Sequence, residues 1–556
     1  MNTTKNIRLF LAFKKIVTSN IFIAFGFALI LSALDEYFLS GLQFYQLARF
    51  SGPVHPALSA IFYATTAVSF GLLAAFLYSS SLAPSWLKIL SFVFFAAALL
   101  IQYSFQHLLG RYIVANDIQM GINSDLTTWL SAASLYFQWK PLIPILLFGT
   151  FLFLYRRKSR LIESSGVFST LIFLIVMMSW IPVEKYSTQK AGEAINYGSP
   201  TTQFIASIRD YIYLRLSRPL REKYEWVGNP DTPKNNIVLI IDESVRADHL
   251  SVNGYRRATT PYLAQLSLDE SLFHNWGDAV AGATCSELSN HLILTGLEVE
   301  GGNYQKTRQY LTVFQYAKAF GYVTYYFDSQ STLFWNGLSD SDRVYIDHIY
   351  PMNKLGNEGM YRDFVAADMT RDIVRSGTGN FIVINKYGVH FRYENDYPEN
   401  QKVWQSTPSS THPDPWLENL IDSYDNALLF NVDGFMRRLI PDLDRFRETT
   451  ERTVYIYTSD HGQSLLENGA QSLHCGKTKP EARVPLIIIG KLGKPVDNSY
   501  RASHSNILPT ILDLMAVPDH LRAHPYNVSL LSATKEQSQE RFYFNGQTNE
   551  VFKYDE

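Results

Sequence analysis

The sequence has little cysteine, little net charge and no repeats. Of its 556 residues only Cys285 and Cys475 are cysteines, which excludes a disulfide-rich scaffold and allows at most one internal disulfide. Two separate buried thiols are the favoured interpretation, and a disulfide is the alternative. A net charge of -2 lacks the basic excess typical of nucleic-acid binding, so we expect no nucleic-acid partner. The length exceeds that of one ordinary domain.

Long uncharged runs are abundant before about residue 185. Each is near the roughly 20 residues that cross a bilayer, and the shortest spans if its flanking residues lie at the interface. No small-residue cleavage site follows the first run, so we expect it to be retained. The sequence predicts a helical membrane domain of five spans: Ile16–Leu34, Ala57–Tyr78, Ile89–Gly110, Pro141–Tyr155 and Ser164–Val183.

Basic residues orient these spans. Lys14 and Lys15 lie near the first run, and Arg156, Arg157 and Lys158 lie between the fourth and fifth. With five spans, both basic groups lie on the same side of the membrane, and the positive-inside rule makes that side cytoplasmic. An odd number of spans carries the rest of the chain to the opposite face. The predicted location is a multi-pass protein of the bacterial inner membrane with its second half in the periplasm.

The composition changes after the predicted spans. Residues 186–234 are mixed and polar and are predicted to form a linker along the membrane surface. From 235 to 556, short β-branched runs alternate with helical patterns such as Leu311–Phe320 and Leu417–Leu439, which indicates an α/β domain with a mostly parallel sheet. The expected strands are Ile237–Ile241, Val323–Phe327, Phe381–Ile384, Val454–Thr458 and Pro485–Ile489.

Several of these strands end in groups that bind metals. The run NNIVLIIDES ends in Asp242-Glu243, TVYIYTSDHG ends in Asp460-His461, and FIVINKYGVH leads to His390. Parallel sheets bind ligands at the carboxyl ends of their strands. Carboxylate oxygen together with imidazole nitrogen suits zinc, and manganese less well. The sequence therefore predicts a metal site at this edge, although each His alone is typical of a structural residue.

A hydroxyl precedes a helical pattern in AVAGATCSELSN. Thr284 follows small residues, and a Glu lies three residues later, as in a capping box. The commoner role of such a Thr is a helix cap. The same position also favours an anion, because free backbone N–H groups point at it.

Five motifs follow one another along the second half: IIDESVRADHLSVNGYRRATTPYL, GATCSELS, KYGVHFRYENDYP, TSDHGQSLLENG and SHSNILPTILDL. Together they resemble the membrane-bound phosphoethanolamine transferases of the alkaline-phosphatase/sulfatase superfamily, of the lipopolysaccharide-core or glucan-modifying type. The resemblance implies an alkaline-phosphatase-like domain in which Thr284 is the nucleophile. The implied ligands of one zinc are Glu243, Thr284, Asp460 and His461. His390 and His474 match histidines around the phosphoryl group, which in some members hold a second zinc.

The resemblance extends to the membrane half. NDIQMGINSDLTTWLS supplies Asn123 and Thr127, which match contacts to the donor headgroup, and FDSQSTLF supplies Ser331, which matches a substrate contact. Ser131 stands where the family has Glu, and Phe334 where the lipid A enzymes have Lys. These two departures leave the identity of the transferred headgroup open.

The function that the resemblance implies is transfer of phosphoethanolamine from phosphatidylethanolamine to an envelope glycan. The expected partners are that donor, membrane lipids and an acceptor such as lipopolysaccharide core, lipid A or a periplasmic glucan. One alternative is transfer of another phosphoryl headgroup, such as phosphoglycerol, by the same chemistry. A second alternative is a non-enzymatic membrane sensor, which is expected to have lost a metal ligand.

Overall fold

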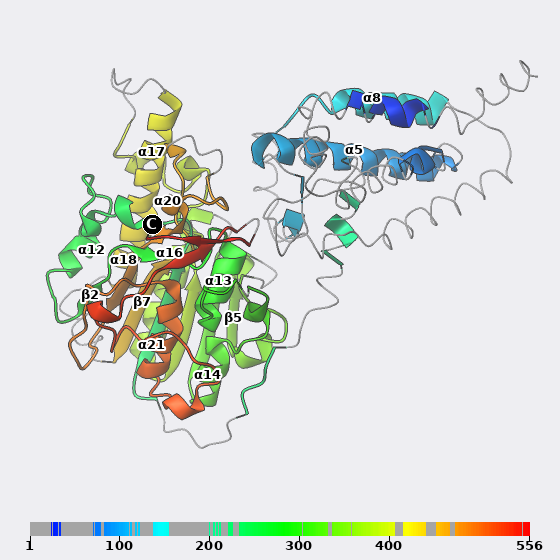
Figure 1. Ribbon diagram of the computed structural model, residues 1–556. Coiled ribbons are helices and arrows are strands. Elements are labelled where there is room, and N and C mark those ends of the chain that lie inside the picture. The colour runs from blue at the N-terminus through cyan, green and yellow to red at the C-terminus, as the bar shows by residue number, and fades with distance from the viewer. Residues whose placement is uncertain are drawn as a thin grey trace, which may run out of the picture. The chain divides into compact units, whose positions relative to one another are not determined.

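The computed structural model of the chain is shown in Figure 1. It describes residues 233–556 except 303, 332–335, 357–358, 406–414, 441–451, 468–472, 547–548 and 556. Before 233 it describes chiefly 83–109, 137–154 and 221–225, with short pieces between 24 and 212. The chain divides into two compact units, Met1–Ser217 and Arg218–Glu556. The predicted domain limits at 185 and 234 stay predictions.

The first unit contains an apolar helix of membrane-spanning length. Within α5 (Ser85–Leu109), the segment Ser85–Gln106 is the single described helix long and apolar enough to cross a bilayer. The shorter apolar helix α8 (Leu142–Leu154) packs on α5. The prediction of five spans is therefore not confirmed. Its first, second and fifth runs lie wholly or largely outside the described residues.

The second unit is built on a seven-stranded sheet of order β2-β9-β7-β1-β6-β4-β5. The five strands from β7 to β5 are parallel, and β9 and β2 add an antiparallel edge. This confirms the predicted mostly parallel sheet. The strands are β1 Asn236–Asp242, β2 Phe273–Asn275, β4 Val323–Asp328, β5 His348–Pro351, β6 Asn380–Asn385, β7 Thr453–Ser459 and β9 Leu486–Ile489.

Strand β1 is buried along its whole length because helices cover both faces of the sheet (Figure 1). Leu239 points into the core that contains α13, α14 and α21, and Ile240 points into the core that contains α12, α16, α17 and α18. An uninterrupted apolar run is the pattern expected of such a strand. The helices are α12 Pro261–Leu266, α13 Ser286–Thr295, α14 Val313–Ala319, α15 Met352–Leu355, α16 Gly359–Ser376, α17 Pro415–Leu428, α18 Gly434–Leu439, α20 Lys479–Ala482 and α21 Ile507–Leu514.

The helix predicted over Leu417–Leu439 is interrupted. Between α17 and α18 lies one π-helical turn, Leu429–Asp433. Such turns occur mostly as single bulges and are frequent at functional sites. In this turn, the backbone carbonyl of Asn431 receives a hydrogen bond from the side chain of Lys386.

Two small sheets were not predicted. Strand β3 (Ala279–Val280) pairs with β8 (Arg483–Val484), and β10 (Phe542–Phe544) pairs with β11 (Val551–Lys553). The second hairpin packs against the segment before α13: Thr284 N donates to Phe544 O, and Phe544 N donates to Gly282 O. The C-terminal part of the chain therefore fixes the path of the segment that leads into α13.

Candidate metal centre

The register between β1 and β7 brings the two predicted acid groups together. Asp242 lies opposite Ser459 in the parallel ladder, and Asp460 N continues it by donating to Asp242 O (2.8 Å). Glu243 and the Asp460-His461 pair therefore leave the same edge of the sheet side by side. Backbone pairing alone fixes this arrangement.

The side chains of Glu243, Asp460 and His461 converge on one point. A ligand atom from each lies within 4.8 Å of the other two, and all three residues are buried. Nε2 of His461 is 3.3 Å from Glu243 Oε1 and 3.7 Å from Asp460 Oδ2. Ligands held about 2.0–2.1 Å from a tetrahedral zinc are roughly 3.3–3.4 Å apart. The cluster therefore has close to the spacing that one zinc ion requires.

The hydrogen bonds of the cluster leave metal-binding atoms unused. Nδ1 of His461 donates to Gly462 O (2.6 Å), so Nε2 faces the cluster and offers its lone pair to a metal when the ring is neutral. Asp460 Oδ1 accepts from the backbone N–H groups of Ser244 and His461, while its buried Oδ2 has no hydrogen-bond partner among the described residues. A buried carboxylate oxygen without a donor is costly unless a cation binds it. The residues present thus fit a metal ion.

The electrostatics of the cluster also favour a cation. Burial raises the pKa of Asp460 to about 8, and the charge of Glu243 acts in the same direction. Burial opposes ionisation of Glu243, but His461 outweighs it and holds the pKa of that carboxyl below its usual value. Burial would lower the pKa of His461, yet the two acids raise it to about 10. Without a metal, Asp460 and His461 therefore keep their protons at neutral pH, and a divalent cation can take the place of both protons between the two carboxylates.

The cluster is held by a residue in a costly conformation. Ser244, directly after Glu243, has a φ of 61°. Its Oγ donates to Glu243 Oε1 (2.7 Å), and its N–H donates to Asp460 Oδ1 (3.1 Å). Residues other than glycine adopt this region at a cost and are found there chiefly at functional sites.

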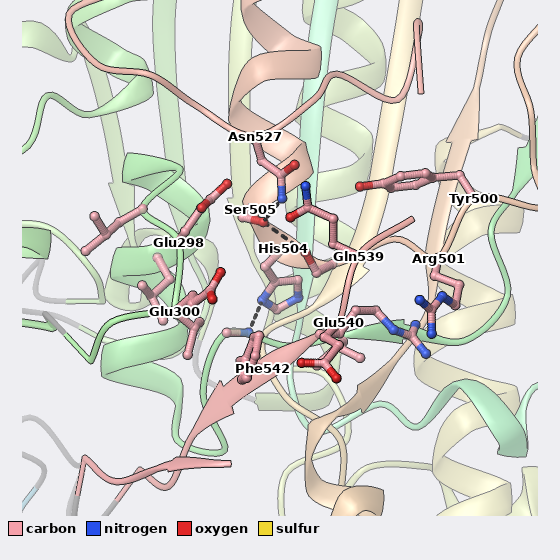
Figure 2. Close-up of a pocket in the computed structure, with 17 residues that line it drawn as sticks. Glu298, Glu300, Tyr500, Arg501, His504, Ser505, Asn527, Gln539, Glu540 and Phe542 are labelled. Atoms are coloured by element: carbon pink, nitrogen blue, oxygen red, sulfur yellow. Dashed lines mark hydrogen bonds between the residues drawn. The ribbon is translucent and has the colours of Figure 1, made fainter. Parts of the chain in front are cut away.

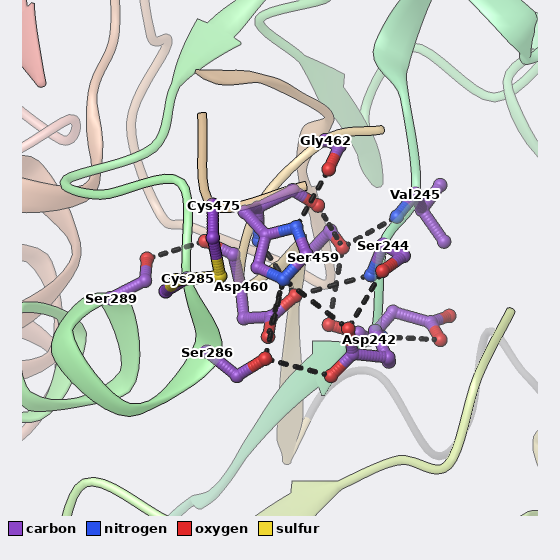
Figure 3. A network of polar contacts seen from close by, with 12 residues as sticks. Asp242, Ser244, Val245, Cys285, Ser286, Ser289, Ser459, Asp460, Gly462 and Cys475 are labelled. Atoms are coloured by element: carbon purple, nitrogen blue, oxygen red, sulfur yellow. Dashed lines mark hydrogen bonds and ion pairs between the residues drawn. A yellow bond between two sulfur atoms is a disulfide. The ribbon is translucent and has the colours of Figure 1, made fainter. Parts of the chain in front are cut away.

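A second hydroxyl, that of Ser286, reaches both Glu243 and His461. Its Oγ donates to Glu243 Oε2 (3.1 Å) and lies 3.2 Å from His461 Nε2 (Figure 3). Ser286 is the first residue of α13, after the N-cap Cys285. It therefore lies where the backbone N–H groups of a helix attract an anion. The sequence analysis missed Ser286, although its place at the start of the helical pattern was the available signal.

Thr284, the predicted nucleophile and fourth ligand, has its hydroxyl engaged elsewhere. Its Oγ donates to Gly476 O (2.7 Å) and accepts from Gly546 N (3.0 Å), and the side chain is fully buried. The structure thus joins three predicted ligands, Glu243, Asp460 and His461, but ties the Thr284 hydroxyl to backbone groups outside them.

The two remaining histidines lie beside the cluster. The ring of His474 stacks on that of His461, with centroids 5.5 Å apart. Burial and the charge of His461 lower the pKa of His474 to about 3, so this ring is neutral. Nδ1 of His390 donates to Phe391 O (2.8 Å), which leaves its Nε2 for another partner.

A glutamine that the sequence analysis missed also contacts the cluster. Gln330, after β4, donates from Nε2 to Glu243 Oε2 (2.9 Å). The predicted Ser331 is buried next to it, and its backbone N–H donates to Asp328 Oδ1 (3.1 Å). The predicted headgroup contacts Asn123 and Thr127 lie outside the described residues.

Cys285 and Cys475 form a disulfide, so the favoured prediction of two separate thiols was wrong. The two cysteines are 190 residues apart in the sequence. Their pairing depends on how β10 and the segment after β7 fold back, which local sequence patterns do not predict. The bond joins the N-cap of α13 to the residue after His474. Cys475 N also donates to Thr284 O (2.7 Å). The crosslink therefore ties Ser286 and His474 to one rigid segment.

A polar cavity is lined by residues that follow α13, that precede α21 and that lead into β10 (Figure 2). Within it, Nδ1 of His504 accepts from Gly282 N (3.1 Å), and its Nε2 donates to Ser459 O (2.9 Å). Burial lowers the pKa of His504 to about 3, so it holds this neutral form. None of the three converging metal-binding residues lines this cavity. We assign His504 a structural role in fixing the end of β7.

A parallel sheet whose carboxyl edge carries carboxylates and an imidazole suited to a metal is typical of the α/β domains of phosphatases and sulfatases. The model of the Sulfatase family matches residues 235–517, more than half of the chain, and the chain belongs to this family.

Two relatives are similar in sequence. The Kdo(2)-lipid A phosphoethanolamine 7''-transferase of Salmonella typhimurium is 26% identical over 282 residues, which cover 49% of this chain and 47% of the relative. Phosphoethanolamine transferase EptC of Escherichia coli is 26% identical over 239 residues, which cover 42% and 40%. The chain spans about half the length of the first relative that it matches.

Two solved structures share the fold. Integral membrane lipooligosaccharide phosphoethanolamine transferase A (EptA) from Neisseria meningitidis has a TM-score of 0.58 at 18% identity, over 88% of this chain and 95% of that one. The periplasmic domain of Escherichia coli EptC in complex with Zn has a TM-score of 0.51 at 19% identity, over 61% and 97%. At these identities the likeness shows the fold alone.

We expect removal of any one ligand to weaken metal binding. Glu243→Gln, Asp460→Asn and His461→Ala should each lower zinc affinity by at least about tenfold, because three converging groups cannot be reduced to two without under-coordinating the ion. The control is Asp519→Asn, since that carboxylate is 94% exposed. Zinc titration of the full-length protein with elemental analysis measures the effect. Three variants with wild-type affinity would show that the cluster is not the metal site.

We expect the disulfide to stabilise the second unit. The chain-entropy model gives roughly 5 kcal/mol for a loop of this length, and measured values are usually about 2–4 kcal/mol. Cys285→Ser with Cys475→Ser should lower the free energy of unfolding by such an amount, measured by denaturant titration. A thiol reductant should lower the stability of the wild type and leave that of the double variant unchanged. Equal shifts in both would contradict the assignment.

Proposed function

We propose that the chain is a zinc-dependent transferase that moves phosphoethanolamine from phosphatidylethanolamine to an envelope glycan through a phosphoserine-type intermediate on Ser286. The observation that carries this proposal is the position of the Ser286 hydroxyl, 3.1 Å from Glu243 Oε2 and 3.2 Å from His461 Nε2. A hydroxyl among metal ligands at a helix N-terminus is arranged for attack on phosphorus.

In this proposal the metal is held by Glu243, Asp460 and His461, with the Ser286 oxygen completing the set. When bound, zinc supplies a Lewis acid that lowers the pKa of the hydroxyl and stabilises charge on the phosphoryl oxygens. The chain's own residues orient the hydroxyl, since Ser286 Oγ donates a hydrogen bond to Glu243 Oε2. Buried walls around Glu243 and Asp460 exclude water from the site.

The reaction then has two balanced steps. Ser286 Oγ forms a bond to the phosphorus of the donor, and the bond from phosphorus to the diacylglycerol oxygen breaks. The Ser286 proton is lost, and the departing oxygen takes up one proton. An acceptor oxygen next attacks the same phosphorus and releases Ser286, with the protons moving in reverse. His390 and His474 flank the phosphoryl group, and Ser331 contacts the substrate.

The first unit supports the membrane part of the proposal. Trp86, Ile89, Leu90 and Val93 form one face of α5, and each is more than half exposed. An apolar helix of this length with an exposed apolar face suits a bilayer. We propose the five-span inner-membrane arrangement, with the second unit in the periplasm and with Asn123 and Thr127 at the donor headgroup. A lipid donor presents its phosphorus at the membrane surface, where that unit meets it.

The relatives support the choice of group and acceptor. Two of the relatives are named Kdo(2)-lipid A phosphoethanolamine 7''-transferase. The related structure of an EptC periplasmic domain is a complex with Zn. We therefore propose a lipopolysaccharide or a related glycan as the acceptor and zinc as the metal.

The decisive test compares the two hydroxyls. Ser286→Ala should lower transfer by about a thousandfold or more, because removal of a nucleophile leaves only the positioning groups. Thr284→Val keeps the shape of Thr284 and is expected to retain most of the activity. Transfer from phosphatidylethanolamine in vesicles to lipopolysaccharide, read by mass spectrometry, measures both. Peptide mapping after incubation with donor should place the adduct on Ser286.

The opposite result has a clear meaning. Loss of transfer in Thr284→Val, with an adduct on Thr284, would assign the nucleophile to Thr284. The mass of the adduct also identifies the headgroup, since phosphoethanolamine and phosphoglycerol differ in mass. No adduct and no transfer by wild-type protein loaded with zinc would reject the transferase proposal.

A further inference from the structure

A fully buried ion pair joins β1 to the loop after β6. Lys386 Nζ pairs with Asp242 Oδ2, and both side chains are 0% exposed. Asp242 is the last residue of β1 and directly precedes Glu243. Lys386 is the first residue after β6 and lies four residues before His390. The pair therefore connects the two segments that carry Glu243 and His390.

Every charged atom of this pair has further partners. Lys386 Nζ also donates to Asn431 O in the π-helical turn (2.7 Å) and lies 4.4 Å from the centre of the Phe435 ring. Asp242 Oδ2 accepts from Tyr457 OH (2.9 Å), and Asp242 Oδ1 accepts from Glu243 N (3.0 Å). Buried polar networks with all partners present make a unique, rigid arrangement.

The loop that starts at Lys386 lies directly on the end of β1. Lys386 N donates to Ile241 O (2.9 Å), and Val389 N donates to Glu243 O (3.1 Å). Between them, Gly388 has a φ of 61°, and a Cβ there would lie 2.6 Å from Glu243 N. The loop has no room to shift toward Glu243, and the ion pair holds it from moving away.

Fold stability alone does not require two charges at this place. Taking a carboxylate and an ammonium out of water is unfavourable for each ion, and an apolar pair of similar size is often at least as stabilising. The charged pair instead fixes the orientation of the Lys386 side chain. Its Nζ has three partners in fixed positions, namely Asp242, the carbonyl of Asn431 and the Phe435 ring.

We propose that Asp242 and Lys386 are positioning residues, whose buried ion pair sets the placement of His390 relative to Glu243. This inference rests on the proposed function, in which His390 flanks the phosphoryl group. The pair itself does not contact the substrate. It acts through the loop from Lys386 to His390, whose position decides whether the imidazole meets the reacting phosphorus.

The test removes both charges together in the full-length protein. Asp242→Asn with Lys386→Met keeps the size of both side chains, and Asn retains an acceptor for Glu243 N. We expect kcat to fall about tenfold to a hundredfold, because a shift of about 1 Å at a reacting group costs this much. KM for the donor and the zinc content should stay within about twofold of the wild-type values.

A second buried ion pair offers a matched control. Arg221 Nε is 2.6 Å from Asp342 Oδ1, and their side chains are 4% and 0% exposed. Arg221→Met with Asp342→Asn removes the same charges from the same unit, and we expect kcat to stay unchanged. Equal loss of kcat in both double variants, or wild-type kcat in the first, would overturn the positioning role.

Hydrogen exchange supplies a readout that does not need transfer activity. Amide exchange in a peptide covering residues 385–391 should rise about tenfold or more in the Asp242→Asn, Lys386→Met variant and stay unchanged in the control. Unchanged protection in the double variant would overturn the positioning role and would leave the proposed function standing. Absence of transfer by the wild type would contradict the proposed function and leave the exchange result to be judged by itself.

A further variant serves if the double variant does not fold. Lys386→Arg keeps the positive charge but replaces a compact ammonium with a larger planar group, which cannot occupy the same three contacts. We expect it to lower kcat with little change in KM. Wild-type kcat in this variant, together with wild-type exchange in the 385–391 peptide, would likewise overturn the proposal.

Discussion

The parallel pairing of β1 with β7 is the constraint on which the candidate site depends. Because Asp242 lies opposite Ser459, the next residues of each strand, Glu243 and Asp460, emerge together at one edge. Two carboxylates and an imidazole are thereby forced into a buried space, where the two carboxylates repel each other unless a cation or protons intervene. A shift of one residue in this ladder would turn Glu243 away from His461 and remove the site.

Structures around the ladder hold its end in place. Ser244 adopts a costly backbone conformation, neutral His504 fixes Ser459 O, and the pair of Asp242 and Lys386 seats the loop that leads to His390. None of these groups has to contact a substrate. They supply the rigid support that a site needs if its reacting groups are to be held within a fraction of an ångström.

Local patterns predicted much of this arrangement and missed what long-range packing decides. The apolar run of β1 and the acids after it were readable because strand ends of a parallel sheet meet at one edge. The start of the helical pattern was a signal for Ser286, but it did not decide between Thr284 and Ser286, which are two residues apart. That choice depends on a contact of Thr284 with Gly546, some 260 residues away, and on the disulfide. The antiparallel edge and the π-helical turn were missed for the same reason.

The central claim is that Glu243, Asp460 and His461 hold one metal ion, with the Ser286 oxygen beside it. X-ray absorption at the zinc edge, measured on the full-length protein loaded with one equivalent of zinc, tests this claim most directly. The account predicts a shell of nitrogen and oxygen only, with the outer-shell scattering of a single imidazole. Two or more imidazoles, or any sulfur in the shell, would contradict it.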